Sequence, residues 1–182
     1  MNSPVIIVPY NLHWPDMYRE EKSLILGLLG AKITAIEHIG STAVPGLGAK
    51  PIIDMMIGVR ELVDAIECIK LLRDAGYTYI PEFEVAIPER RFMWKGSAEC
   101  HTIHLHMVEA TSDFWQRHIL FRDYLRAHPG AAAEYHTVKT GLAAQYRNDR
   151  DGYTDAKSLF IKSVEEKARK ERNLTHNKEY CY

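Results

Sequence analysis

The order of apolar and polar residues predicts alternating helices and strands in the first part of the chain. Residues 15–29 carry apolar side chains at helical spacing, and Pro15 suits the first turn of a helix. Residues 33–39 predict a strand. Residues 51–59 are almost continuously apolar and rich in isoleucine, which is typical of a buried strand. Helical spacing returns over residues 61–75, so we expect a helix, two strands and a second helix in this order.

The pattern changes near residue 111. Before that point, three further strands are predicted, at residues 77–80, 90–95 and 102–109, with a loop at 81–88. After it, three helices are predicted, at residues 112–127, 131–148 and 154–171, with Pro129-Gly130 and Asp151-Gly152 as separators.

These elements predict one domain of the α/β (α+β) class. A mixed or mostly antiparallel sheet flanked by helices would occupy about residues 1–110, and a helical part about residues 111–170. The whole domain is predicted to span residues 1–170, followed by a polar tail over residues 171–182.

Composition and charge narrow the classes of function. The 182 residues are 46% hydrophobic and 26% charged, which provides enough apolar material for a packed core. The formal net charge is −1, so we expect no nucleic-acid partner, because such proteins normally carry a basic excess. The sequence has no apolar run of membrane-helix length and no signal-peptide pattern, so we expect a cytoplasmic protein with no membrane partner. It does not specify an oligomeric state.

A glycine-rich stretch after the strand at residues 33–39 is the first candidate site. Gly40 lets another group approach the backbone closely, and the hydroxyl groups of Ser41 and Thr42 can bind phosphate oxygens beside free backbone N–H groups. Lys50 would add a positive charge. The alternative is an ordinary turn in which a hydroxyl caps a short helix.

Asp54 is a carboxylate inside the apolar strand at residues 51–59. A buried carboxylate needs a cation, a base or hydrogen-bond donors. We therefore predict that Asp54 binds a divalent metal, Mg²⁺ or Mn²⁺, since Mg²⁺ prefers carboxylates and substrate phosphates. The alternative is a structural salt bridge.

A glycine-serine pair followed by a carboxylate in an apolar strand resembles the polymerase-β-like nucleotidyltransferase superfamily. More closely, the chain resembles the GrpB family over roughly residues 5–165. That resemblance is carried by Val8-Pro9-Tyr10, Trp14-Pro15, the run His38–Leu47, Lys50–Asp54, Arg90-Arg91-Phe92, His104-Leu105-His106, Phe121–Arg126 and Tyr153–Lys157. It implies a nucleotidyltransferase-like fold and a nucleotide as ligand or substrate. Related modules are fused to dephospho-coenzyme A kinases.

Met56 departs from the superfamily pattern, which has a second acidic residue at this position. Alternation along a strand places Asp54 and Met56 on one face, about 7 Å apart. A two-metal site needs ligands on both sides of the transferred group, and Met56 is not a ligand for Mg²⁺. Either the second ligand comes from elsewhere, or nucleotidyl transfer has been lost.

His104 and His106 are the candidates for that other source. They share one face of the predicted strand at residues 102–109, so both can reach one site. Imidazole suits Zn or Ni better than Mg, and a neutral histidine can also act as a general base. The alternative is two ordinary residues on a polar face.

Four further residues complete the candidate set: Arg91, Tyr153, Lys157 and His38. Arg90 and Arg91 alternate in direction at the start of a strand, and Arg91 is chosen to bind a phosphate, against the alternative of a surface salt bridge. Tyr153 and Lys157 lie four residues apart on one helix face and could close over a base or a phosphate, although Tyr153 could simply pack the helix start. His38 either positions the glycine-serine turn or is structural.

Three hypotheses about function follow. The first is a metal-dependent nucleotidyl or phosphoryl transferase in which Asp54, His104 and His106 are catalytic and metal-binding residues. The second is an inactive ligand-binding or accessory module, for example in coenzyme A metabolism. The third is a metal-assisted hydrolase. All three expect a small phosphate-containing partner.

Overall fold

A mixed five-stranded sheet lies at the centre of the fold, in a computed structural model that describes residues 4–172. The strands lie in the spatial order β1 (Ala35–Ile39), β2 (Ile53–Val59), β5 (His101–Glu109), β4 (Arg91–Gly96) and β3 (Thr78–Tyr79). The central strands β2 and β5 run parallel, and all the other neighbouring strands are antiparallel. The prediction of a mixed sheet flanked by helices is confirmed.

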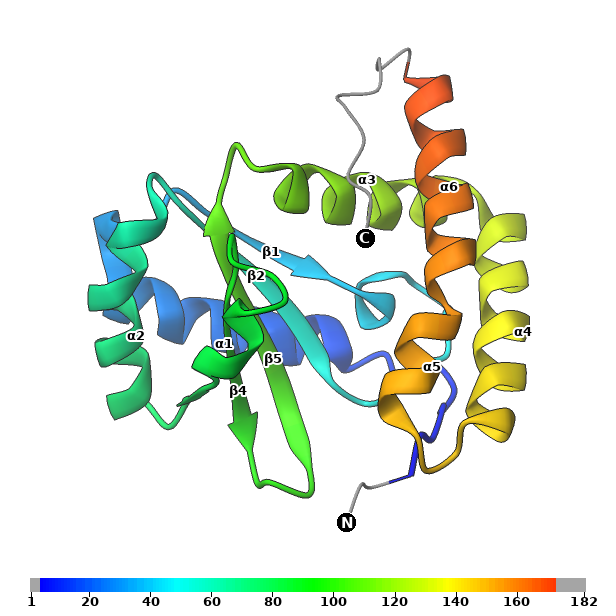
Figure 1. Cartoon of the computed structure of the whole chain (residues 1–182), viewed down its shortest axis with the longest axis horizontal. Helices are drawn as coiled ribbons and strands as arrows, with labels where there is room; N and C mark the ends of the chain where they lie inside the picture. The colour runs from blue at the N-terminus through cyan, green and yellow to red at the C-terminus, as the bar shows by residue number, and fades with distance from the viewer. Residues whose placement is uncertain (1–3, 173–182) are drawn as a thin grey trace.

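Two helices cover one face of the sheet (Figure 1). These are α1 (Trp14–Leu29) and α2 (Ala65–Asp74). Alternation along the strands turns Met55 and Leu105 toward this face, where they are fully buried in the main hydrophobic core. The apolar faces of both helices fill the same core, as the helical spacing predicted.

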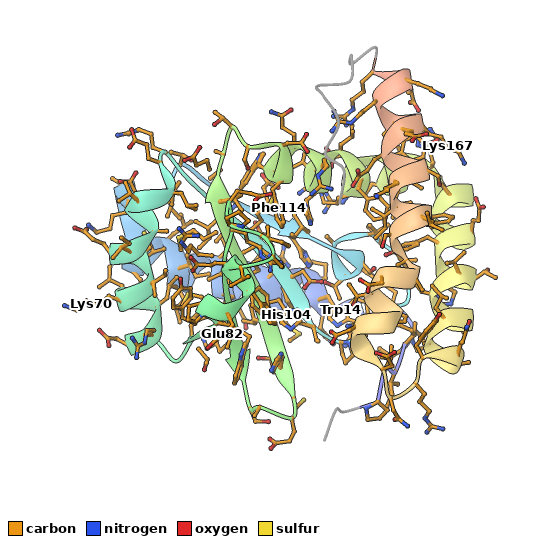
Figure 2. All side chains as sticks on the ribbon, viewed as in Figure 1. Trp14, Lys70, Glu82, His104, Phe114 and Lys167 are labelled. Atoms are coloured by element: carbon orange, nitrogen blue, oxygen red, sulfur yellow. The ribbon has the colours of Figure 1, made fainter. Side chains whose placement is uncertain are left out.

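The other face of the sheet is only partly apolar. Met56 and Val108 pack there against Phe114, which belongs to α3 (Asp113–Ala127) and lies between that helix and the sheet (Figure 2). The same face also carries Asp54, His104 and His106, because they alternate with the core residues of β2 and β5. The polar side chains therefore lie at one end of this face.

The helical layer beside this polar end consists of α4 (Pro129–Gln145), α5 (Arg150–Ala156) and α6 (Ser158–Glu171), as Figure 1 shows. The loop between β1 and β2 connects this layer to the sheet. Val44 and Leu47 from the loop are buried against residues of α3, α4 and α6. The glycine-serine turn at the start of the loop is thereby held between the sheet and the helices.

The predicted helix at residues 154–171 is wrong at its start. Helix α5 begins at Arg150, and Asp151-Gly152, the predicted separator, lies inside it. The cause is a cap: the Asp149 side chain accepts a hydrogen bond from the Gly152 N–H at 2.9 Å, which starts the helix earlier. A Cβ on residue 152 would lie 2.3 Å from the same carboxylate, so glycine is needed for this cap.

Other differences are smaller. The predicted loop at residues 81–88 contains a 3₁₀ turn, Pro81–Glu84, and α4 begins at Pro129 because proline is tolerated in the first helical turn. Among residues 4–172, no helix is long and apolar enough to span a membrane. Most of the predicted polar tail, residues 173–182, lies outside the described part of the chain.

Candidate functional site

Gly40 brings the turn after β1 against the carboxylate of Asp54. Its φ of 68° lies in the region that favours glycine, and a Cβ at this position would lie 2.4 Å from Asp54 Oδ2. Residue 54 is also the register partner of Ile39, the last residue of β1. The sequence at residue 40 therefore sets how closely Ser41 and Asp54 approach each other.

Thr42 has a structural role in this turn. Its hydroxyl donates to the carbonyl oxygen of Ile52 at 3.2 Å, and His38 Nε2 lies 3.0 Å from the same hydroxyl oxygen. Burial lowers the pKa of His38 to about 4, so the ring is neutral and donates from Nε2. Tyr18 stacks on the ring with 4.7 Å between centroids. Of the two interpretations of His38, the structural one fits this network.

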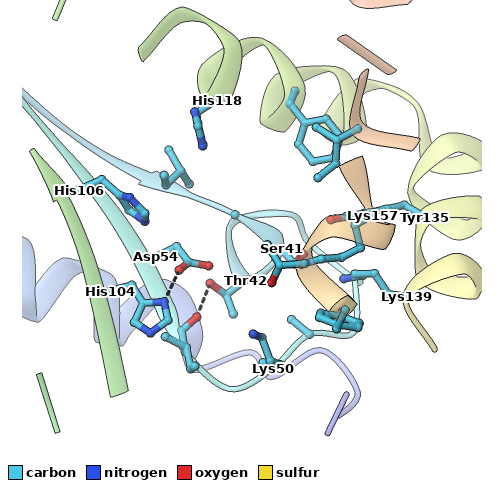
Figure 3. Close-up of a pocket in the computed structure, with 18 of the residues that line it drawn as sticks. Ser41, Thr42, Lys50, Asp54, His104, His106, His118, Tyr135, Lys139 and Lys157 are labelled. Atoms are coloured by element: carbon cyan, nitrogen blue, oxygen red, sulfur yellow. Dashed lines mark hydrogen bonds and ion pairs between the residues drawn. The ribbon is translucent and has the colours of Figure 1, made fainter. Parts of the chain in front are cut away.

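Asp54 forms the central polar contact of the site, with His104 as its partner. Asp54 Oδ1 lies 3.2 Å from His104 Nδ1. Figure 3 marks this contact with a dashed line. Burial alone would raise the pKa of Asp54, but the hydrogen bond and charge of His104, with His106 and Lys50, hold it below its ordinary value. The ionised carboxylate only accepts, so His104 Nδ1 carries a proton. His104 Nε2 in turn lies 3.1 Å from Nδ1 of His101.

Two more histidines continue this polar edge, and both are neutral at pH 7. Burial lowers the pKa of His106 well below its ordinary value, and Nδ1 of its ring is buried without a hydrogen-bond partner. Burial also lowers the pKa of His118 to about 4. His118 Nδ1 lies 2.7 Å from the carbonyl oxygen of Phe114 and therefore donates to it. His118 was not predicted, because nothing in the sequence of α3 relates it to β5.

Three lysines lie on the opposite side of the site (Figure 3). Burial, together with the charges of Lys157 and Lys50, lowers the pKa of Lys139 to about 7, although Asp54 acts to raise it. Burial and the charge of Lys50 likewise lower the pKa of Lys157 to about 8. Lys139 donates to the carbonyl oxygen of Gly48 at 2.6 Å.

Aromatic rings hold these lysines in place. The Lys157 ammonium lies 4.3 Å from the centroid of the Tyr153 ring, and the Lys50 ammonium lies 5.5 Å from it. The Lys139 ammonium lies 4.8 Å from the centroid of the Tyr135 ring. Lys139 was missed in the sequence, although it occupies the middle of a buried i, i+4, i+8 series between Tyr135 and Ala143 on α4.

Asp54, the three lysines and the histidines at positions 104, 106 and 118 border one cavity of about 380 Å³, a size typical of small-molecule sites. Every predicted site residue lines it except Arg91 and His38. Four cationic side chains line the cavity, against the two carboxylates of Asp54 and Glu165: Lys50, Arg90, Lys139 and Lys157. The cavity is therefore cationic within a chain whose net charge is −1.

The choice of Arg91 over Arg90 is a correction. Phe92 pairs with His106 across β4 and β5, so residue 90 shares the cavity face and residue 91 shares the opposite face. Arg91 instead forms an ion pair with Glu84 at 3.0 Å and donates to the carbonyl oxygen of Pro88. Arg90 is the arginine that lines the cavity.

The donor atoms around Asp54 do not fit a two-metal site. Met56, two residues after Asp54 on the same face of β2, is fully buried against the α3 side of the sheet. Of the Asp54 oxygens, one contacts His104 and the other lies against Gly40. Within residues 4–172, no group of three or more His, Cys, Asp or Glu side chains could hold a metal ion. A single divalent metal that enters with a phosphate ligand stays a prediction, and it would depend on Asp54.

These features define a class: a mixed α/β protein with a cationic, histidine-edged cavity between its sheet and a helical layer. The family described as GrpB protein matches residues 4–167, and the chain belongs to that family. It is similar to the crystal structure of conserved protein GrpB from Enterococcus faecalis, with a TM-score of 0.83 and 34% identity, covering 92% of this chain and 99% of that one.

Three relatives differ in how much of their length the chain covers. It is 41% identical over 181 residues to the UPF0157 protein YqkA of Bacillus subtilis (strain 168), covering 98% of this chain and 52% of that protein. It is 36% identical over 162 residues to the glutamate-rich protein GrpB of Alkalihalophilus pseudofirmus, covering 88% and 93%. It is 28% identical over 188 residues to a dephospho-CoA kinase of Mycolicibacterium paratuberculosis, covering 91% and 46%. The chain thus spans about half the length of YqkA and of the kinase.

Proposed function

We propose that this protein binds a small phosphate-containing molecule in the cavity, and that Lys50, Lys139 and Lys157 contact its phosphate groups. The observation that carries this proposal is the convergence of the three lysines on one cavity, beside the hydroxyl of Ser41. Ammonium groups donate strong charge-assisted hydrogen bonds to phosphate oxygens. Their number fits a ligand with several negative charges.

The electrostatics of the empty cavity favour such a ligand. Burial, and then the charges of neighbouring lysines, lower the pKa of Lys139 and of Lys157, so both ammonium ions are destabilised when no ligand anion is bound. A phosphate between them would reverse this effect and raise both pKa values. Because the lysines supply the counter-charge, binding of the phosphate does not require the second metal carboxylate that Met56 replaces.

A nucleotide or a coenzyme A derivative is the ligand class that we favour. Gly40-Ser41 at the end of a strand, followed by Asp54 on the next strand, matches the nucleotidyltransferase layout, and this is the support for placing the fold in that superfamily. Similarity to a protein named dephospho-CoA kinase adds support for this ligand class.

Calorimetry with pyrophosphate, ATP, GTP, CTP and coenzyme A, with and without Mg²⁺, tests the proposal. We expect at least one probe to bind and Lys157→Met to weaken it about tenfold or more. Lys167→Met is the matched control, since Lys167 is exposed on α6, the helix that follows Lys157, and lies outside the cavity (Figure 2). Absence of binding by every probe, or equal losses in both variants, would contradict the proposal.

Nucleotidyl or phosphoryl transfer is the second candidate function. It is favoured by the ionised Asp54 and its contact with His104 at the edge of the cavity, where a general base would be needed. Incubation with γ- and α-labelled ATP and a cell extract would detect it. Label transfer that Asp54→Asn abolishes would support an enzyme, and ligand binding without label transfer would support a binding module.

A further inference from the structure

Arg90 carries a half-buried charge that the three lysines do not explain. Its guanidinium carbon lies 5.2 Å from the ring centroid of Phe92 and 5.8 and 5.9 Å from those of Phe114 and Phe83. Three aromatic rings thus surround the guanidinium and leave it half-buried. Burial lowers the pKa of Arg90, because the charged form loses hydration.

No acidic side chain forms an ion pair with Arg90 in the part of the chain that the structure describes. Within residues 4–172, Arg90 takes part in no ion pair, and its Nε is buried without a hydrogen-bond partner. Glu84, the carboxylate nearby on the preceding turn, pairs with Arg91 instead. Glu89 contributes a charge interaction but no ion pair.

The surroundings of Arg90 also provide hydrogen-bonding groups without adding charge. His106, the register partner of Phe92, has a buried Nδ1 with no partner. His118 donates from Nδ1, so its Nε2 is an acceptor at neutral pH. Both rings line the same cavity as Arg90. An anion at this end would face the Arg90 guanidinium and two neutral imidazoles, and the Asp54 carboxylate, whose charge acts on both rings, borders this end.

The two ends of the cavity are built from different elements. The lysine end comes from α4, the residue after α5 and the loop before β2, whereas Arg90 and the histidines come from the sheet and α3. Figure 3 shows His106 and His118 across the cavity from Lys139 and Lys157. One small phosphate at the lysines would therefore leave the Arg90 end without a counter-charge.

We propose that the ligand has two acidic ends: a phosphate at the lysines and a second anionic group, a carboxylate or a phosphate, paired with Arg90. The planar guanidinium can donate two parallel hydrogen bonds to either group. This inference rests on the proposed function and narrows its substrate class. Within that class, a ligand with its charge at one end only would leave Arg90 unpaired.

A series of probes of increasing length tests the second end. Phosphate monoesters of straight-chain ω-hydroxy acids with two to six carbons are compared by calorimetry with alkyl phosphates of equal length. Bisphosphates of the matching diols, with one phosphate at each end, form a third arm. Comparing their affinity with that of the phosphorylated hydroxy acids shows whether a carboxylate or a phosphate is the preferred second group. We expect the wild type to bind one length of the two-ended probes about tenfold or more tighter than its alkyl phosphate.

The matched variants are Arg90→Met and Arg91→Met. The first removes the guanidinium from the aromatic rings and keeps an apolar side chain of similar length, and the second removes a neighbouring arginine outside the cavity. We expect Arg90→Met to abolish the gain from the second acidic group while alkyl phosphates still bind, and Arg91→Met to keep the gain. Arg90→Lys should keep only part of it, and thermal unfolding establishes that each variant is folded.

The outcomes separate the two proposals. If alkyl phosphates bind in a Lys157-dependent way but no two-ended probe binds more tightly, the inference of a second anionic group is wrong. The proposal that the lysines bind a phosphate would then be retained. A gain that persists in Arg90→Met, or equal weakening of both probe series in that variant, also overturns the inference. If neither series binds, and pyrophosphate does not bind either, the proposed function fails and this inference with it.

Discussion

Binding of a phosphate ester at pH 8 should be accompanied by uptake of protons by Lys139 and Lys157. Burial and mutual repulsion lower the pKa of Lys139 to about 7 and that of Lys157 to about 8. At pH 8, Lys139 is therefore mostly neutral and Lys157 about half protonated. A phosphate anion between them favours the charged form of both and raises both pKa values.

The expected uptake follows from these protonation states. Full protonation of both lysines takes up roughly one to one and a half protons per ligand at pH 8. At pH 6 both lysines are already charged, so their contribution falls close to zero. A phosphate monoester has its second pKa near about 6, so at pH 8 the ligand itself contributes little.

Calorimetry in several buffers of different ionisation enthalpy measures this number directly. The Lys139→Met variant should lose the larger part of the proton uptake, because only Lys157 remains to be protonated. It should keep an uptake of roughly half a proton per ligand at pH 8. Lys167→Met, outside the cavity, should match the wild type. Tight binding at pH 8 with no proton uptake would refute the reasoning, because it would mean that the ligand does not meet these ammonium groups.

Three other predictions concern stability. Lys139→Met should raise the free energy of unfolding by on the order of 2–4 kcal/mol at pH 7, because the folded protein lowers the lysine pKa from 10.5 to about 7. The unfolded chain binds more protons between those values, so denaturant titrations should show this advantage shrinking as pH rises from 7 to 10.5. Gly40→Ala should cost about 2 kcal/mol or more, since φ is 68° and the new Cβ would meet Asp54, and phosphate affinity should fall with it; an unchanged melting temperature would contradict this. Thr42→Val should cost about 1–3 kcal/mol by leaving His38 without its partner, yet leave phosphate affinity unchanged in calorimetry; a large loss of affinity would assign Thr42 to the ligand instead.

The sequence predicted the sheet side of the site well. Asp54, His104 and His106 share one face because strand side chains alternate, and this rule needs no knowledge of the partner strands. The same rule led to the wrong choice of Arg91, because the sequence does not show which set of alternate residues in β4 faces the cavity. The register of Phe92 with His106 decides it, and that register exists only in the folded sheet.

The helical side could be predicted only in part. Tyr153 and Lys157 were paired correctly by their spacing, although a helix boundary at Lys157 separates α5 from α6. The position of Lys139 in the cavity depends on how α4 packs against the loop before β2, where Lys139 donates a hydrogen bond to the carbonyl oxygen of Gly48. Residue spacing within α4 carries no information about that contact. The start of α5 was also mispredicted, because the capping side chain of Asp149 changes the helix boundary without changing the hydrophobic pattern.

The most direct test of the lysine phosphate site is a crystal structure of the protein soaked with tungstate, a heavy analogue of phosphate. The account predicts an anomalous peak in the cavity within hydrogen-bonding distance of Lys139, Lys157 and the Ser41 hydroxyl, and loss of that peak in Lys157→Met. A cavity without tungstate, in crystals that bind the anion only at the protein surface, would contradict it.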